Sequence, residues 1–304
     1  MPCIRPGTAM GLRLLCAASA LLCASACAAP STTAAATPEP TAAAGEVARD
    51  ALAARPLDAL VAQVQHDPSN EYGLLIEDLA SGHRLAMNQD RVFPSASVYK
   101  LALAWEALRQ ADRGRIQLDE PLEITAEDAV EDEPAGGLGP GDTPTVREAL
   151  DLMVSVSSNA AAHALLRLVG RDAFNQDMDQ VGLPQTRVPA AEDGSEAVTS
   201  AEDVARLLRF IALGQGLSSP AQSVLHGALQ QAQFPDPLRD TLPGDVTILD
   251  KTGNLDDASN VGAVLSTPRG TVLMVVLDSG VDPGTARGVI AQLGWAAYEA
   301  YLQQ

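Results

Sequence analysis

Hydrophobic positions change their spacing along the chain, and each change predicts a different kind of element. Apolar side chains recur at helical spacing over residues 56–67 (PLDALVAQVQHD), and Asp67–Pro68 predicts the end of that helix. Two shorter apolar segments follow in EYGLLIEDLASGHRLAMNQ, on either side of Ala80-Ser81-Gly82. This pattern is typical of two strands joined by a hairpin turn.

The middle of the chain, from about residue 97 to 232, is mostly helical in its periodicity. The helical segments are VYKLALAWEALRQ, TVREALDLMVSV, AAAHALLRLVG, SAEDVARLLRFIAL and PAQSVLHGALQQA. Strand-like segments then return as DVTILDKTG, SNVGAVLSTP and GTVLMVVLDS, with Pro268-Arg269-Gly270 joining the last two. A final helix is predicted over GTARGVIAQLGWAAYEAYL.

These elements predict one α+β domain over residues 56–304. Two strands near its start cannot form a stable sheet alone, because an isolated hairpin is marginal in water. We therefore expect one five-stranded antiparallel sheet, built from residues 56–96 and 245–304 and covered by the first and last helices. Residues 97–244 form an inserted helical lobe, and a ligand cleft is expected where lobe and sheet meet.

The first 27 residues have a different character and are predicted to be a secretory leader. They contain all four cysteines of the chain, Cys3, Cys16, Cys23 and Cys27. Two arginines precede the apolar run LLCAASALLCASA, which is shorter than the roughly 20 residues of a membrane-spanning helix. Residues 28–55, rich in Ala, Thr and Pro, suit a flexible linker.

The leader ends in Ala24-Ser25-Ala26-Cys27, which resembles a bacterial lipobox. That resemblance implies a diacylated Cys27 as the first mature residue, whereas an ordinary A-x-A cleavage site implies simple secretion. Both alternatives place the protein outside the cytoplasm, either secreted or periplasmic, and lipidation would attach it to the outer face of a bacterial membrane.

Charge and residue usage restrict the partners. The formal net charge is −19, and such an acidic surface repels nucleic-acid phosphates and anionic lipid headgroups. The four histidines form no H-x-x-x-H or H-x-H pair, and no cysteine follows residue 27, so neither a metal nor another cofactor is expected. A small molecule is the expected ligand, a lipid anchor the only membrane contact, and a monomer the expected state.

Three short segments carry candidate chemistry. Ser97 and Lys100 are three residues apart at the start of a predicted helix, so that both side chains lie on one face. A serine hydroxyl needs a neighbouring base to become a nucleophile, and a dehydrated lysine can be that base. Arginine cannot, because its guanidinium keeps its proton in proteins.

The second segment is Ser157-Ser158-Asn159, in a break between two predicted helices, where serine and asparagine also serve as helix caps. The third is Lys251-Thr252-Gly253, at the end of a predicted strand. A lysine and a threonine there can bind a carboxylate, and a glycine allows close approach to the backbone. Lys100 and Lys251 are the only lysines in the chain, which favours a functional interpretation of the set.

At these residues the sequence resembles the penicillin-recognising serine hydrolases, with their boxes S-x-x-K, S-x-N and K-T-G in this order. The resemblance runs from about residue 56 to the C-terminus and is closest to class A β-lactamases. FPSASVYK, for example, matches the family's F-P-x-x-S-x-x-K. The implied fold is that of β-lactamases and transpeptidases.

The resemblance also implies a role for each matching residue. Ser97 is the acylated nucleophile, Lys100 its general base, and Ser157 relays a proton to the leaving nitrogen. Asn159 holds the substrate amide, and the Lys251-Thr252-Gly253 box holds its carboxylate. The backbone amides of Ser97 and Asn254 form the oxyanion hole.

Three departures from the class A pattern bear on the fate of an acyl-enzyme. Ser158 replaces the aspartate of S-D-N, and His163 replaces an asparagine that helps to hold the loop of the deacylating glutamate. That loop, PQTRVPAAEDGSEAVTSAEDV, is short and lacks E-P-x-L-N. It offers only Glu192, Asp193 and Glu196, of which Glu192 is the candidate general base for deacylation.

Three functional hypotheses follow. The first is a serine hydrolase that turns over β-lactams through an acyl-enzyme, as class A β-lactamases do. The second is a D-alanyl-D-alanine peptidase or penicillin-binding protein that deacylates slowly. The third is a tethered cell-wall-binding module that keeps the fold without turnover.

Overall fold

The computed structural model describes residues 57–66, 71–129, 133, 137–190 and 195–303. The predicted leader and linker, with Cys27, lie outside these residues, and so does Glu192. None of the helices within the described ranges combines the length and the apolar character that crossing a membrane requires.

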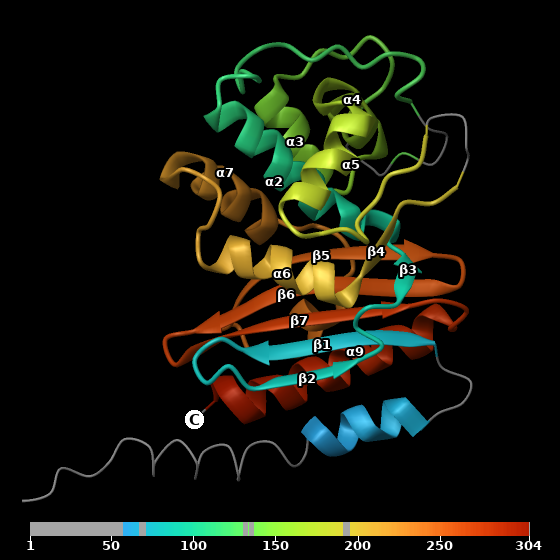
Figure 1. Ribbon diagram of the computed structural model, residues 1–304, viewed down its shortest axis with the longest axis vertical. Coiled ribbons are helices and arrows are strands. Elements are labelled where there is room, and N and C mark those ends of the chain that lie inside the picture. The colour runs from blue at the N-terminus through green and yellow to red at the C-terminus, as the bar shows by residue number, and fades with distance from the viewer. Residues whose placement is uncertain (1–56, 67–70, 130–132, 134–136, 191–194, 304) are drawn as a thin grey trace, which may run out of the picture. The chain divides into compact units, whose positions relative to one another are not determined.

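A five-stranded antiparallel sheet is the base of the domain, as the sequence predicts (Figure 1). Its strand order is β2-β1-β7-β6-β5. The strands are β1 (Tyr72–Asp78), β2 (Arg84–Met87), β5 (Thr247–Leu255), β6 (Ala258–Thr267) and β7 (Gly270–Asp278). Leu75 of β1 pairs with Val275 of β7, so the N-terminal hairpin joins the three C-terminal strands directly.

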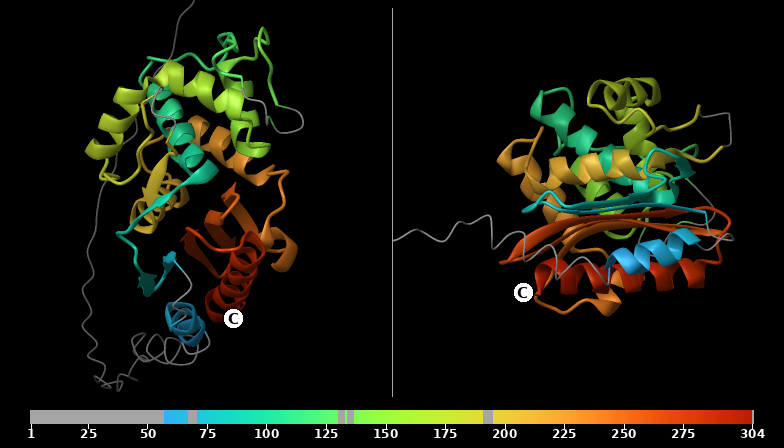
Figure 2. Two further views of the ribbon diagram at one scale, coloured as in Figure 1. Left: turned by 90° about the vertical axis from the view of Figure 1, so that its right-hand side faces the viewer. Right: turned by 60° about the horizontal axis from the view of Figure 1, so that its bottom comes forward.

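Both faces of the sheet are covered. Leu74 and Ile76 of β1 face a core shared with α9 (Pro283–Ala297) and the helix over residues 57–66, whereas Leu75 faces the helices on the other side. The right-hand view of Figure 2 shows these two helical layers with the sheet between them. Burial on both faces explains why residues 72–76 of β1 (YGLLI) show no alternation of polar and apolar residues.

Most helices of the inserted section begin at a residue whose side chain caps the helix. These helices are α2 (Tyr99–Asp112), α3 (Val146–Ser155), α4 (Asn159–Val169), α5 (Arg171–Gln180), α6 (Ala201–Ala212), α7 (Ser219–Gln230) and α8 (Pro237–Thr241). Thr145 and Glu148 form a capping box at α3, and Ser158 accepts a hydrogen bond from Ala161 N at α4. The last helical element of the described residues is η2 (Tyr298–Leu302), directly after α9.

The mostly helical section also contains a strand that the periodicity did not indicate. β4 (Val198–Ser200) pairs antiparallel with β3 (Val92–Pro94) in a separate two-stranded sheet. Three residues are too few to establish an alternating pattern. The pairing matters for the site, because it brings Ala197 O within 2.7 Å of Ser95 N.

Candidate active site

Ser97 lies in a short 3₁₀ turn, η1 (Ala96–Val98), at the start of α2. The preceding Ala96 has a φ of 46°, a left-handed conformation that is uncommon for a residue with a Cβ. Ser95 stabilises this turn, because its hydroxyl donates to Ala197 O at 3.0 Å. Backbone strain of this kind costs of the order of 1–3 kcal/mol and concentrates at functional sites.

Strand β5 packs directly against η1, and Gly253 allows the approach. A Cβ at position 253 would lie 2.8 Å from both Ser95 O and Ser97 N, and 2.9 Å from Ala96 Cβ. Real Cβ atoms do not tolerate such contacts, so this position requires glycine. The third motif segment is thereby held beside the first.

Lys100 is buried between η1 and the break that precedes α4, with 1% of its surface exposed. Its Nζ donates to Ser157 O at 2.6 Å and to Asn159 Oδ1 at 2.7 Å, and it lies 3.3 Å from Ser157 Oγ and from Ser158 O. Burial lowers the pKa of Lys100 from 10.5 to about 7, although the nearby Glu133 carboxylate opposes that shift. A large fraction of Lys100 is therefore neutral near pH 7.

Ser157 bridges the lysine and the candidate nucleophile. Its Oγ donates to Ser97 Oγ at 3.1 Å and lies 3.3 Å from Lys100 Nζ. Ser157 has a φ of 62°, the second left-handed non-glycine residue at the site. The sequence predicts Lys100 as a base beside Ser97, and the structure inserts Ser157 between them in a continuous chain of polar atoms.

Glu133 is part of this site, although no sequence motif indicates it. Its Oε2 accepts hydrogen bonds from Asn159 N at 3.1 Å and Ala160 N at 3.0 Å, and its Oε1 accepts one from Ser158 Oγ. The carboxylate thus satisfies free amides at the start of α4. No sequence signal distinguishes Glu133 from its acidic neighbours in the segment EDE.

The Lys251 box lies on β5, beside the turn that contains Ser97. Lys251 is fully buried, donates from Nζ to Thr252 O at 2.8 Å, and lies 3.9 Å from the centroid of the Phe234 ring. Burial, together with the positive charge of Lys100, lowers the pKa of Lys251 well below 10.5. Phe234 is also absent from the sequence prediction, since an isolated phenylalanine in a loop gives no signal.

Asn254 follows Gly253 on the exposed edge of β5. Its Oδ1 accepts a hydrogen bond from Ser259 Oγ at 2.8 Å, which holds the side chain against the neighbouring strand. The first, second and third motif segments, with Asn254, therefore meet in one region, at the junction of the sheet and the helical lobe.

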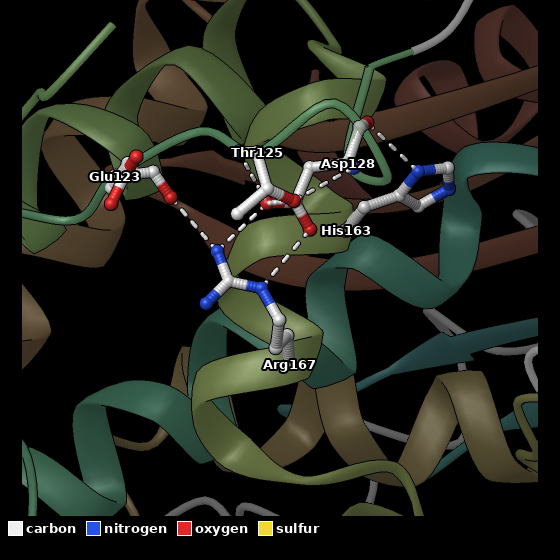
Figure 3. A network of polar contacts seen from close by, with 5 residues as sticks. All are labelled: Glu123, Thr125, Asp128, His163 and Arg167. Carbon is white, nitrogen blue, oxygen red and sulfur yellow. Dashed lines mark hydrogen bonds and ion pairs between the residues drawn. The ribbon is translucent and has the colours of Figure 1, made fainter. Parts of the chain in front are cut away.

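His163 lies on α4, about one turn after Asn159, in a polar network that Figure 3 shows. Its Nδ1 is 3.1 Å from Asp128 O, and Arg167 donates from Nη2 to Asp128 Oδ2 at 2.7 Å. Thr125 N also donates to Asp128 Oδ2, at 2.9 Å. His163 and Arg167 are both on α4, so the network attaches the loop around residue 125 to that helix.

A cavity of about 1000 Å³ opens beside the network. The described residues that line it include Tyr99, His163, Arg171 and Glu196, but neither Ser97 nor Lys100. Burial raises the pKa of Tyr99 to about 12, with Glu196 adding to the effect. Of the three candidate acids Glu192, Asp193 and Glu196, only Glu196 is described, and it borders a space whose lining does not include the candidate nucleophile.

The arrangement provides a serine, a hydroxyl bridge and a buried lysine that can take up a proton near neutral pH. These are the elements of nucleophilic catalysis on an acyl group. Within the ranges that the structure describes, no group of three or more His, Cys, Asp or Glu side chains is placed to hold a metal ion.

Comparisons with known proteins agree with this geometry. The sequence model of the β-lactamase enzyme family matches residues 53–301. The fold is similar to that of PBP-A, with 24% identity, 83% of this chain and 97% of that chain covered, and a TM-score of 0.75. It is also similar to the ancestral class A β-lactamase of Gram-negative bacteria, with 29% identity, coverages of 81% and 99%, and a TM-score of 0.72. A third similar structure is a β-lactamase from Xanthomonas campestris pv. campestris, with 25% identity, 81% of this chain and 97% of that chain covered, and a TM-score of 0.72.

Proposed function

Because the chain belongs to the β-lactamase enzyme family, we propose that it is an exported serine hydrolase that β-lactams or D-Ala-D-Ala-like amides acylate at Ser97. Class A-like β-lactam hydrolysis is the preferred activity. The observation that carries the proposal is the series of hydrogen-bonded atoms Ser97 Oγ, Ser157 Oγ and Lys100 Nζ, in which the lysine has a pKa of about 7.

In the acylation step, Ser97 Oγ attacks the carbonyl carbon of the amide while its proton passes to Ser157. Ser157 in turn gives its own proton to neutral Lys100. The backbone amides of Ser97 and Asn254 stabilise the resulting oxyanion. The carbon–nitrogen bond then breaks, the proton returns from Lys100 through Ser157 to the leaving nitrogen, and an ester on Ser97 remains.

Substrate binding is assigned to the residues around this chain. Asn159 holds the amide of the substrate, and Lys251 with Thr252 holds its carboxylate. Burial disfavours the charged form of Lys251, whereas an arriving carboxylate favours it, so the proposal includes proton uptake by Lys251 on binding.

Deacylation requires a base that activates water, and the assignment is Glu192, which lies outside the described residues. Without such a base the ester persists. A D-alanyl-D-alanine peptidase or penicillin-binding protein is therefore the second candidate, and the missing E-P-x-L-N and the serine at position 158 favour it. An idle wall-binding module is the third, and the buried, low-pKa lysine argues against it.

The proposed location follows from the N-terminal sequence alone. Residues 1–27 are proposed as an export signal, with lipidation at Cys27 tethering the domain outside the cytoplasmic membrane through residues 28–55. A mature protein that begins at residue 28 or 29 without lipid would contradict the tether but not export.

Intact-mass spectrometry over time, after mixing with penicillin G, tests the proposed function. This probe is chosen because a PBP-A variant has been captured as its acyl-enzyme. We expect the protein to gain the mass of one penicillin, and Ser97→Ala to gain none. An adduct that decays within seconds supports a β-lactamase, and one that lasts for hours supports a peptidase or binding protein.

Two results would contradict parts of the proposal. A protein that forms no adduct and consumes no penicillin would overturn acylation of Ser97 by this ligand. A Glu192→Gln variant whose adduct decays as fast as that of the parent would remove Glu192 as the deacylation base.

A further inference from the structure

We propose that Glu133 is a positioning residue for acylation, whose carboxylate holds the turn Ser157–Asn159 so that Ser157 bridges Ser97 and Lys100. This inference rests on the proposed function for its kinetic consequence. Its structural consequence, a defined environment for Lys100, does not depend on any substrate.

The Glu133 carboxylate contacts three consecutive residues at the start of α4. One oxygen accepts hydrogen bonds from Asn159 N and Ala160 N, and the other accepts one from Ser158 Oγ. Ser158 Oγ in turn accepts from Ala161 N at 3.1 Å. Glu133 therefore fixes the side of the turn that presents hydrogen-bond donors.

Lys100 fixes the opposite side of the same turn. Its ammonium contacts the carbonyl oxygens of Ser157 and Ser158. The Ser158 carbonyl belongs to the same peptide unit as Asn159 N, which Glu133 binds, and a trans peptide points these two groups in opposite directions. Ser157 needs this support, because a φ of 62° is unfavourable for a residue with a Cβ. Because Glu133 and Lys100 both hold the backbone of the turn by hydrogen bonds, Ser157 Oγ stays within 3.1 Å of Ser97 Oγ.

Described residues that precede and follow Glu133 in the sequence are held by hydrogen bonds of their own. Asp128 accepts hydrogen bonds from Arg167 of α4, as Figure 3 shows. Ile124 N donates to Asp142 O at 2.9 Å and Gly141 N donates to Ile124 O at 2.8 Å. Glu133 thus lies in the sequence between residues that are held in place, one of which is attached to the same helix.

Charge gives Glu133 a second effect on the same lysine. Among the residues that the structure describes, two charged groups act on Lys100: Glu133, which favours its ammonium form, and Lys251, which is close enough for the two positive charges to interact. Removing the Glu133 charge leaves burial and Lys251, and both favour neutral Lys100. The pKa of Lys100 should then fall below that of the parent.

Lysine NMR measures this effect without any substrate. The chain has only two lysines, so protein labelled with ¹³C at lysine Cε gives two signals, and Lys251→Arg assigns them. We expect Glu133→Gln to shift the titration midpoint of Lys100 to lower pH. Glu148→Gln is the matched control, because Glu148 also caps a helix in this lobe but lies at the start of α3, and it should leave the Lys100 midpoint unchanged.

Penicillin G acylation measures the positioning effect. We expect Glu133→Gln to acylate about 10- to 100-fold more slowly, the scale of loss for a misplaced catalytic group. Adding Ser158→Asp puts a carboxylate inside the turn, at the helix N-cap, and should restore most of the rate. Glu148→Gln should acylate at the rate of the parent.

The outcomes separate this inference from the proposed function. If no variant reacts with penicillin but Glu133→Gln still shifts the Lys100 midpoint, the proposed function fails and the placement of Glu133 stands. If Glu133→Gln unfolds at a lower temperature than the parent but keeps the parental titration midpoint of Lys100 and the parental acylation rate, the positioning role is overturned. If the double variant Glu133→Gln/Ser158→Asp reacts with penicillin G no faster than Glu133→Gln alone, loss of the carboxylate is not the cause of the slower acylation.

Discussion

The chemistry of this site depends on a lysine that burial keeps close to neutral. Lys100 is almost fully enclosed, and its four polar contacts come from the turn that also supplies Ser157. An arginine could fill the space but could not give up its proton. The scarcity of lysine in the chain therefore points to the two positions where lysine has a specific use.

Ser157→Ala should slow acylation by about 100-fold or more, because it removes the hydroxyl bridge between Ser97 and Lys100. Ser155→Ala is the matched control, since Ser155 is buried two residues earlier at the end of α3. The rate of adduct formation with penicillin G is measured for both variants and for the parent. Equal rates for Ser157→Ala and the parent would show that Lys100 does not act through Ser157.

The acylation rate should rise with pH through a midpoint of about 7. Below that pH Lys100 holds a proton and cannot accept another, and above it the neutral amine is available. In the described part of the chain, the charged groups that act on Lys100 are Glu133 and Lys251. A rate that stays constant from about pH 5 to about pH 9 would contradict a lysine base.

At the scale of single residues, the sequence predicts what short motifs encode. Ser97, Lys100, Ser157 and Lys251 belong to boxes whose residue types suit the chemistry. Glu133 reaches the site from a loop, and only the folded chain places it at the start of α4. The same is true of Phe234, which meets Lys251 through a contact between distant parts of the chain.

At the scale of elements, the site depends on the contact between β5 and η1. Strand β5 is the edge of the sheet nearest the helical lobe in Figure 1, and Gly253 lets its backbone touch the turn that contains Ser97. Hydrophobic periodicity predicts β5 and α2 as elements, but it does not predict how closely they approach. Nor does it predict β4, because so short a strand depends on its partner β3.

Gly253→Ala should lower the free energy of unfolding by about 1–3 kcal/mol and strongly reduce acylation, because its methyl group would collide with Ser95 O and Ser97 N. Gly244→Ala is the control, since a Cβ at that position meets nothing within 4 Å. Urea unfolding and adduct formation measure the two effects. A Gly253→Ala protein with parental stability and rate would contradict the close packing of β5 on η1.

At the scale of the whole molecule, the sheet connects the site to a buried acid. Asp278 ends β7, and its Oδ2 accepts a hydrogen bond from Ser259 N at 3.0 Å, while its Oδ1 is buried without a hydrogen-bond partner among the described residues. Burial, with a contribution from Asp257, raises the pKa of Asp278 to about 7. The sequence predicts the sheet that contains Asp278, because its apolar strands are long, but not the environment of this carboxyl.

Asp278 should make the protein less stable as the pH rises from about 4 to about 7. In that range the folded state holds a proton that the unfolded state has lost, so each added pH unit favours unfolding by at most about 1.4 kcal/mol. Asp278→Asn removes this contribution, and its stability relative to the parent should increase with pH. Urea unfolding near pH 5 and near pH 8 measures the difference, and identical pH dependence in both proteins would contradict the assignment.

The location of the adduct shows directly whether Ser97 is the nucleophile. Trypsin cleaves after Arg91 and Lys100 and releases residues 92–100 (VFPSASVYK), which contain Ser95 and Ser97. After reaction with penicillin G and rapid acid quench, fragmentation of this peptide should place the added mass on Ser97 alone. An adduct on Ser95, or on a peptide from any other part of the chain, would contradict the account.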